Sequence, residues 1–289
     1  MRRVALRIVI FGPGRIGVAF ARALARARCD VLGFVGRDPA RAAAAVAAAG
    51  CGRVLAAADH VHAQAVVFAV GDDDLAGAIA AAAAAAPPRP CSLWLHTSGR
   101  HGLEVFDGLA GIRRGIVHPT TPVPAHSPGV EPLRGAPGVL VGDPRAQRLL
   151  RALCRRLGLV PFDGHGGNRA LYHAACALAA NGLTGLFAEA AAACAASGVV
   201  RGADAARLVE ALMRGALQAC GDRGSVDGLT GAVRRGDTAT VAAHLCELRA
   251  HAPAAVPAYL ATAHAALRLA RAAGLSPMRA DAVAAALDA

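Results

Sequence analysis

The spacing of hydrophobic positions changes about halfway along the chain. In the first half, short apolar runs alternate with alanine-rich stretches of helical period, the pattern of a parallel β-sheet with covering helices. The apolar runs predict strands at Arg7–Phe11, Val31–Val35, Ala65–Val70, Ser92–Leu95, Gly115–Val117 and Val139–Val141, with a last strand signal at Leu159–Phe162. The stretches between them predict helices at Ile16–Ala27, Pro39–Ala49, Leu75–Ala86 and Arg145–Leu157.

From about Asn168 onward the strand signals cease and the pattern is helical, with breaks at residues 198–202, 221–228 and 253–257. We therefore expect two domains. Residues 1–165 predict an α/β domain with a Rossmann-type parallel sheet, and residues 166–289 predict an all-α domain. The proline- and glycine-rich segment Pro119–Pro137 is expected to form an ordered loop beside the functional site.

One apolar stretch, Ala174 to Val200, is long enough to span a bilayer. Polar residues interrupt it, and alanine predominates over leucine. This favours a buried helix over a membrane span, and we expect no membrane association. A helix that is apolar on most sides belongs at the centre of a helical domain or in a dimer interface.

Composition narrows the classes of function. All 31 basic residues are arginine, against 20 acidic ones, for a formal charge of +11. The arginines never occur in runs longer than a pair, and aromatic residues make up only 3% of the chain, which leaves little for base stacking. We therefore expect anionic small molecules as ligands and no nucleic acid. The lack of lysine excludes Schiff-base chemistry and a lysine proton donor.

Cysteine and histidine spacing points away from metal sites and disulfides. The eight cysteines include no CxxC pair, and the eleven histidines show no HExxH-like ligand spacing. Scattered cysteines at apolar positions are typical of free thiols in a reducing compartment. No convincing signal peptide precedes the first strand, so a cytoplasmic location is expected.

A glycine fingerprint follows the first predicted strand and opens the first helix. Gly12-Pro13-Gly14-Arg15-Ile16-Gly17 matches G-x-G-x-x-G. In this pattern the first glycine makes a tight turn, the second lets the backbone approach a pyrophosphate, and the third allows close helix–strand packing. The pyrophosphate would lie at the helix N-terminus, where free N–H groups favour anions. These six residues are predicted to bind a dinucleotide.

The end of the second strand bears on which nicotinamide cofactor fits. NAD-binding folds usually place an acidic residue there, whereas this chain has Gly36-Arg37-Asp38. Arg37 matches a 2′-phosphate, so NADP is favoured over NAD. Asp38 keeps NAD open, and it could equally cap the helix that begins at Pro39. Val70 and Gly71, at the end of the third predicted strand, are expected to contact the cofactor.

Four further motifs carry a resemblance to a known family. They are His96-Thr97-Ser98-Gly99, Val117-His118-Pro119, Tyr172-His173-Ala174-Ala175, and Leu229-Thr230-Gly231 running into Arg235-Gly236-Asp237. With the glycine fingerprint, they make the chain resemble, over nearly its whole length, the two-domain Rossmann-like oxidoreductases whose helical half is known as domain of unknown function 2520. More distantly, the chain is similar to pyrroline-5-carboxylate reductase and the 6-phosphogluconate dehydrogenase superfamily.

The resemblance implies an NADP-binding Rossmann domain, a helical C-terminal domain that forms a homodimer, and a cleft between the domains. It supplies no substrate. It also exposes a departure, because the hydroxyacid dehydrogenase branch uses a lysine four residues before an asparagine as proton donor. Here Ala177 precedes Asn181 at that distance, so another group must donate the proton.

The histidines that end predicted strands are the first candidates for that proton. His96 and His118 fall at the carboxyl ends of their strands, where a nicotinamide would lie. Each is either a catalytic residue or a structural histidine. Thr97 is expected to contact the cofactor and Ser98 the substrate.

The helical half adds further candidates. His173 and Asn181 lie about 80° apart on a regular helix and can face one cleft, whereas Tyr172 points nearly opposite to Asn181. We count His173 and Asn181 among the catalytic candidates and leave a helix–helix hydrogen bond open for Asn181. Thr230 and Arg235 either anchor an anionic substrate or belong to a capped turn.

The first hypothesis is an NADP-dependent oxidoreductase that transfers hydride between nicotinamide and a small carbonyl or imine substrate in the interdomain cleft. The alternative is a non-catalytic NADP(H)-binding sensor or regulatory module, motivated by the missing lysine. Ketopantoate reduction is a third possibility, and it would require turnover without that lysine.

Overall fold

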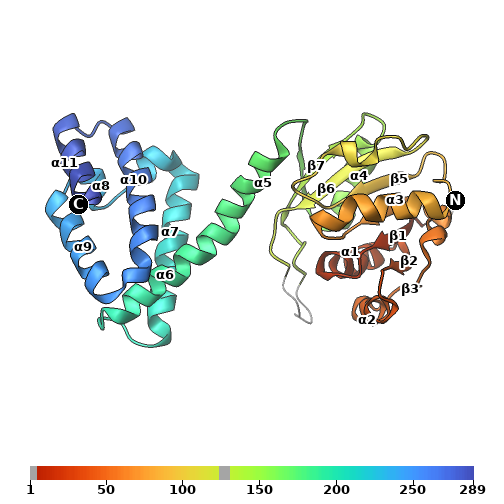
Figure 1. Ribbon diagram of the computed structural model, residues 1–289, viewed down its shortest axis with the longest axis horizontal. Helices are drawn as coiled ribbons and strands as arrows, with labels where there is room; N and C mark the ends of the chain where they lie inside the picture. The colour runs from red at the N-terminus through yellow and green to blue at the C-terminus, as the bar shows by residue number, and fades with distance from the viewer. Residues whose placement is uncertain (1–4, 124–130) are drawn as a thin grey trace. The chain divides into compact units, whose positions relative to one another are not determined.

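The computed structural model describes residues 5–123 and 131–289 (Figure 1). The chain forms two compact units, Met1–Ala177 and Leu178–Ala289. The first compact unit ends with the helix α5 (Arg169–Ala177). Part of the expected loop Pro119–Pro137, residues 124–130, lies outside the described residues.

The first unit is built on one eight-stranded sheet with the order β3-β2-β1-β4-β5-β6-β7-β8. The strands are β1 (Arg7–Phe11), β2 (Asp30–Val35), β3 (Arg53–Val54), β4 (Ala65–Phe68), β5 (Leu93–His96), β6 (Arg113–Pro119), β7 (Pro137–Gly142) and β8 (Val160–Asp163). The strand order reverses at β1, which has β2 on one side and β4 on the other. In a doubly wound sheet, that reversal is where ligands bind.

The predicted α/β fold with a helical second half is confirmed, with two differences in the sheet. β7 runs antiparallel to β6, so the sheet is mostly rather than wholly parallel. β3 is an additional edge strand of two exposed residues. Two residues are too few to give the alternating pattern from which a strand is predicted.

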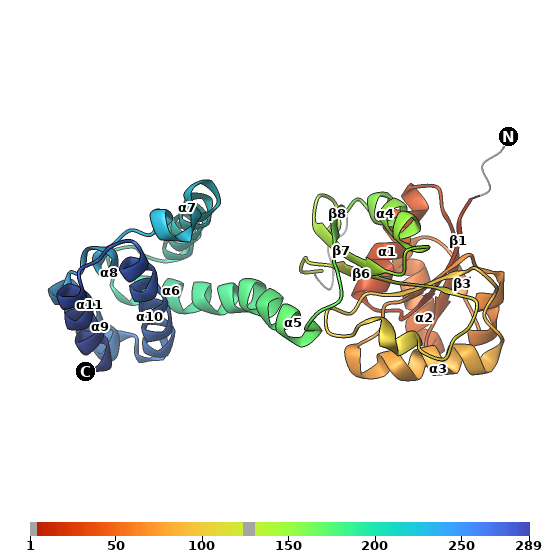
Figure 2. The ribbon, with the colours of Figure 1, turned by 90° about the horizontal axis from the view of Figure 1, so that it is seen from above.

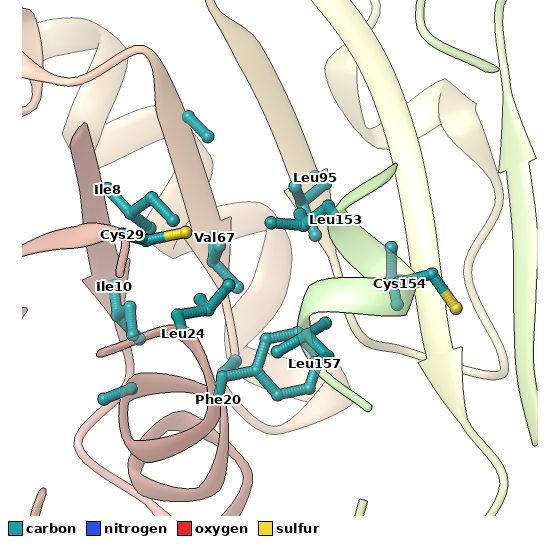
Figure 3. Close-up of a cluster of buried hydrophobic side chains, with 14 of the residues drawn as sticks. Ile8, Ile10, Phe20, Leu24, Cys29, Val67, Leu95, Leu153, Cys154 and Leu157 are labelled. Atoms are coloured by element: carbon teal, nitrogen blue, oxygen red, sulfur yellow. The ribbon is translucent and has the colours of Figure 1, made fainter. Parts of the chain in front are cut away.

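Helices cover both faces of the sheet (Figure 2). They are α1 (Arg15–Arg26), α2 (Pro39–Ala49), α3 (Leu75–Ala85) and α4 (Gln147–Arg156). On one face, Phe20 and Leu24 of α1 and Leu153 of α4 pack against strand residues, as Figure 3 shows. On the other face, the α3 residues Leu75 and Ile79 join a second buried cluster. These two cores hold the carboxyl ends of the parallel strands at one edge.

The second unit is helical throughout its described residues. Its segments are the π-helical turn η4 (Leu178–Gly182), α6 (Leu183–Ala196), α7 (Ala203–Gly228), α8 (Ala232–Arg235), α9 (Thr238–His251), the short 3₁₀ turn η5 (Pro253–Ala255), α10 (Val256–Ala272) and α11 (Pro277–Asp288). Its core comes from α9, α10 and α11, represented by Leu245, Leu267 and Val283.

This core leaves out the apolar stretch that the sequence suggested as a buried central helix. The helical run Arg169–Ala196 is long and apolar enough to cross a membrane, and none of its most apolar window is buried within the chain. The expectation of a helix buried inside the helical domain is therefore wrong. The physical reason is that α9–α11 complete a core among themselves. An interface with a second copy remains a prediction.

Candidate functional site

The glycine turn after β1 has the geometry that each of its three glycines predicts. Gly12 adopts φ +108, and a Cβ there would collide with the carbonyl of Ala69. A Cβ on Gly17 would collide with the carbonyl of Gly12, so α1 packs directly onto the turn. Gly14, by contrast, has no atom within 4 Å of the place of a Cβ. The turn is therefore closed on its protein side and open at Gly14, where a pyrophosphate needs room.

A pocket of about 800 Å³ opens at this turn. Of the predicted cofactor residues, those that line it are Gly12, Pro13, Gly14, Arg37, Val70 and Gly71. Arg15, Ile16 and Gly17 lie outside the lining, in the first turns of α1, and Thr97 follows β5. Arg41, Asp73 and Asp74 also line the pocket and were not predicted. Arg41 lies in the first turn of α2, four residues after Arg37 in the sequence.

The arginine expected to recognise a 2′-phosphate is exposed to solvent and already has an acidic neighbour. The Arg37 side chain is 87% exposed, and its Nη2 lies 2.9 Å from Oδ2 of Asp74 in the 3₁₀ turn η2 (Asp72–Asp74). Asp38 does not face the ribose position through a free carboxylate, because its Oδ1 accepts the N–H of Ala40 at 2.8 Å and caps α2. This contact favours the capping interpretation of Asp38.

The contacts of His96 favour its structural interpretation over the catalytic one. The side chain is fully buried at the end of β5. The backbone N–H of Ser98 donates to Nδ1 at 3.2 Å, so the ring proton sits on Nε2 and is donated to the carbonyl of Gly102 at 3.1 Å. Burial lowers the pKa of His96 to about 4, with a further lowering from the charge of Arg169. Both nitrogens are thus committed to the loop that follows.

Ser98 and Gly99 shape that loop. The hydroxyl oxygen of Ser98 accepts the N–H groups of Arg100 and His101 at 3.0 and 3.1 Å, which fixes the turn while leaving its own O–H free to donate. A Cβ on Gly99 would lie 2.8 Å from Nε2 of His118 and 2.8 Å from Cδ2 of His173. Gly99 was not among the predicted site residues, although it belongs to a quoted motif. It lets the two imidazoles lie directly against the backbone.

His118 forms a pair with a tyrosine that sequence reasoning set aside. Its Nδ1 lies 2.7 Å from the hydroxyl of Tyr172 on α5, with the rings edge-on at 79°. His173 lies next to it, with ring centroids 6.3 Å apart. Burial lowers the pKa of His118 to about 4, and the charge of Arg169 adds to this effect. Burial raises the pKa of Tyr172, as does the neighbouring Cys176 thiol. At neutral pH this is a neutral imidazole beside a protonated phenol.

Arg169 is a second site residue that belongs to none of the motifs found in the sequence. Its Nε donates to the carbonyl of His101 and its Nη2 to that of Ser98, both at 3.1 Å. The guanidinium also lies 5.1 Å from the centroid of the Tyr172 ring. Arg169 therefore fixes α5 to the loop after β5 and places a positive charge beside the imidazole–phenol pair. Only the tertiary contact reveals this role.

Two polar contacts connect the loop after β5 to the aspartate turn η2 at the wall of the pocket. His101 donates from Nε2 to the carbonyl of Asp72 at 3.1 Å, and Arg100 lies 3.5 Å from Asp73. The same aspartate turn provides Asp73 and Asp74 to the pocket lining. The glycine turn, the pocket and the His118–Tyr172 pair thus lie at the carboxyl ends of the parallel strands of one sheet.

The remaining predicted residues belong to the second unit. Asn181 is exposed within the π-helical turn η4, and this turn breaks the regular 100° spacing on which the comparison of His173 with Asn181 depended. Thr230 and Arg235 line a separate cavity described below. Among the described residues, no group of three or more His, Cys, Asp and Glu side chains converges on a metal position.

Comparisons with known proteins agree with this architecture. A protein from Bacteroides fragilis, provisionally described as an NADP oxidoreductase, is 18% identical and matches with a TM-score of 0.70 over 93% of this chain and 98% of its own. A Thermotoga maritima protein is 19% identical, with a TM-score of 0.68 over 91% and 99%. Pyrroline-5-carboxylate reductase from Coxiella burnetii is 16% identical, with a TM-score of 0.55 over 97% and 96%. At these identities the likeness shows the fold.

No curated protein matches the sequence. Two family models do: the Rossmann-like domain over residues 1–121, and the domain of unknown function 2520 (DUF2520) over residues 136–282. The second model alone covers half of the chain, and the resemblance inferred from the motifs is confirmed. The chain belongs to the family of proteins with a Rossmann-like domain and a domain of unknown function 2520.

Proposed function

We propose that this protein is an NADP(H)-dependent oxidoreductase that transfers hydride between the nicotinamide and a small carbonyl or imine substrate. The observation that carries the proposal is the pocket at the glycine turn together with an imidazole–phenol pair at the carboxyl ends of the same parallel strands. Arg169 packs on the phenol ring and donates to the carbonyl of His101, whose ring donates to the carbonyl of Asp72 beside the pocket. Structural relatives described as oxidoreductases and dehydrogenases support the same class of reaction.

The residues of the pocket fit a dinucleotide. The open space at Gly14 and the N-terminus of α1 suit a pyrophosphate, because the first N–H groups of a helix favour anions. Arg37 and Arg41 lie in the lining at the end of β2, where the adenosine ribose binds in this fold. Two arginines, and an Asp38 whose carboxylate is used to cap α2, favour a 2′-phosphate and hence NADP over NAD. When bound, the cofactor supplies the hydride.

The protein itself must hold and move a proton. We assign this to Tyr172, with His118 as its positioning residue: the phenol keeps its proton at neutral pH and donates it to the substrate atom that becomes the alcohol or amine, and water then restores the phenol proton. The hydrogen bond between Tyr172 Oη and His118 Nδ1 holds the phenol in place. Arg169 beside the ring offsets negative charge that develops on the phenol oxygen. His173 packs on the pair, and His96 holds the loop in place. Ser98, through its free O–H, stays a proposed substrate contact in the first unit. The predicted substrate contacts of the second unit, Thr230, Arg235 and Asn181, stay predictions, and Thr230 and Arg235 are treated below with the cavity that they line.

A homodimer is part of the proposal. Leu178, Leu212 and Leu217 of the second unit are 76%, 64% and 57% exposed in the single chain. A second copy covering these side chains would bury apolar surface that a monomer leaves in water. Light scattering on the purified protein tests this, and a monomer at micromolar concentration would contradict it.

The test of the function begins with cofactor binding. Trp94 is the one tryptophan of the chain and is fully buried in β5. Because the carboxyl end of β5 belongs to the proposed site, NADPH bound there should quench the emission of Trp94. NADPH oxidation is then followed at its absorbance band with a panel of ketoacids, imines and hydroxyacids. Absence of NADPH binding would remove the proposal. Tight binding with no turnover on the panel would favour the alternative, a non-catalytic NADP(H) sensor.

Tyr172→Phe isolates the proton-transfer assignment. Loss of the phenol proton should lower kcat by about 10²–10⁴-fold while NADPH affinity stays unchanged. The chain offers a matched control, because Tyr259 makes the same type of pair with His244 Nδ1 at 3.0 Å in the second unit. Tyr259→Phe should leave kcat near the wild-type value. Equal losses in both variants would contradict the assignment.

A further inference from the structure

A second cavity, of about 830 Å³ and widely open to solvent, is lined only by residues of the helical unit. Its lining joins the turn before α8, the end of α8 and the start of α11. The polar residues that face it are Thr230, Arg234, Arg235, Ser276 and Arg279. It shares no residue with the pocket at the glycine turn.

Two of the three guanidinium groups of this cavity, those of Arg234 and Arg279, are oriented by backbone carbonyls. Arg234 donates from Nη2 to the carbonyl of Ala273 at 3.3 Å, and Arg279 donates from Nη1 to the carbonyl of Arg235 at 3.3 Å. Each of these groups uses one N–H on a carbonyl and keeps others of its five for a ligand. Gly236, at the end of α8, lies close enough to Arg279 that a Cβ would come within 2.8 Å of the arginine Cβ. The two helix ends thus form a close-packed frame.

The positive charge of the cavity is not balanced by the nearest acid. Asp237 lies 3.9 Å from Arg235, but its two carboxylate oxygens accept the N–H and the hydroxyl of Thr240 at 3.1 and 2.7 Å. That carboxylate caps α9. Three arginines therefore face the cavity against one acid that is already engaged, which favours binding of an anion.

The rest of the lining supplies donors of the kind that an oxyanion needs. Ser276 precedes α11, and its side chain makes no capping hydrogen bond. The first N–H groups of a helix lack partners within the helix. Among the described residues, no hydrogen-bond partner lies within reach of the Thr230 hydroxyl. Hydroxyl and backbone donors next to guanidinium groups are a typical set for phosphoryl or carboxylate oxygens.

We propose that this cavity binds a small organic molecule through a carboxylate or phosphoryl group, held by Arg234, Arg235 and Arg279 with the hydroxyls of Thr230 and Ser276. The site belongs to the helical unit alone. It therefore stands whether or not the chain binds a dinucleotide, and it defines the anionic part of the ligand rather than the reaction.

Peptide-mapped arginine modification tests the proposal on the full-length wild-type protein. Phenylglyoxal reacts with free guanidinium groups, and mass spectrometry after cleavage by a protease that does not cut at arginine gives the rate at each site. Inorganic phosphate and malonate are the two probes, one for each oxyanion class, with chloride at equal ionic strength as the control for screening. NADPH forms a separate arm that reports on Arg37 and Arg41.

Either oxyanion should slow modification at Arg234, Arg235 and Arg279 together, by about tenfold at ten times its dissociation constant, since only the free fraction reacts. Arg207 and Arg214, exposed on α7, are the matched controls and should react at unchanged rates. Protection by one probe alone identifies the class of group. Unchanged rates at the three arginines with both probes, or equal slowing at Arg207 and Arg214, would overturn the site.

A variant gives an independent check. Arg279→Gln should weaken protection of Arg234 and Arg235 at least severalfold, whereas Arg207→Gln should leave it unchanged. Protection of Arg37 and Arg41 by NADPH should be the same in both variants. Loss of that protection with the cavity result intact would count against the proposed function and not against this site.

Discussion

Acidification should destabilise the Rossmann-like unit through His96 and His118. Both pKa values lie at about 4 in the folded chain, below the usual 6.5, because burial disfavours the charged ring. Between pH 6.5 and 4 the unfolded chain binds more protons than the folded chain does. The free energy of unfolding therefore falls as the pH drops through 6.5, and the fall ends near pH 4.

The size of the effect follows from the same values. For one histidine, a pKa lowered from 6.5 to about 4 changes the free energy of unfolding by about 3 kcal/mol between pH values above 6.5 and below 4. About 2 kcal/mol of this stability is lost by pH 5. His118 is partly exposed and contributes less than His96. Together they should remove about 3–4 kcal/mol between pH 7 and pH 5, a large part of the 5–15 kcal/mol that is typical of a domain.

Urea unfolding at pH 7 and pH 5, followed by Trp94 emission, measures this directly. Trp94 lies in β5, two residues before His96, and reports on the first unit. His118→Asn should reduce the difference between the two pH values by about 1–2 kcal/mol. His165→Asn, at an exposed position, should leave the difference unchanged. A wild-type difference below about 1 kcal/mol, or an unchanged difference in His118→Asn, would refute the linkage.

Three further predictions concern single side chains. Arg37→Gln should weaken NADPH binding about tenfold with little effect on NADH binding. Asp74→Asn should strengthen NADPH binding slightly, since the exposed Arg37–Asp74 pair that it removes is worth at most about 1 kcal/mol. Calorimetry with both cofactors measures these changes, and an equal loss of NADH affinity in Arg37→Gln would contradict the assignment. Gly99→Ala should cost about 1–3 kcal/mol of unfolding free energy, because its Cβ meets two imidazoles. Gly77→Ala, with open space around it in α3, should be neutral or stabilising, and the same response in both would count against this contact. Arg169→Gln should raise the pKa of His118 in an NMR titration, since a positive charge is removed from its surroundings; an unchanged or lower pKa would contradict this.

Much of the first unit was predictable because its signals are local. β1 and α2 begin and end where the pattern predicts, and the other expected helices of the unit agree to within a few residues. Buried parallel strands are continuous apolar runs, and helices between them have capping residues such as Asp38. The antiparallel direction of β7 was not predictable, because it depends on how the chain returns after β6 rather than on the residues of β7.

The candidate site was likewise predictable only where its residues belong to a local motif. Gly12, Gly14 and Gly17 were identified because each answers a backbone requirement that recurs wherever a strand turns into a helix around a pyrophosphate. Tyr172 was set aside on helical periodicity alone, and Arg169 carried no motif. Their selection needed the contact between α5 and the loop after β5, two segments about seventy residues apart, as the separation of Arg169 from Ser98 shows.

The sequence by itself determined the two-domain architecture and the glycine turn, since periodicity and backbone requirements are properties of neighbouring residues, and its motifs carried the resemblance to the family. Only the tertiary structure decided which partners each candidate histidine has. His96 and His118 both end strands at the same edge, yet one has both nitrogens bonded within its loop and the other meets a phenol. The difference comes from burial and from partners distant in sequence, which set a pKa but leave no pattern along the chain.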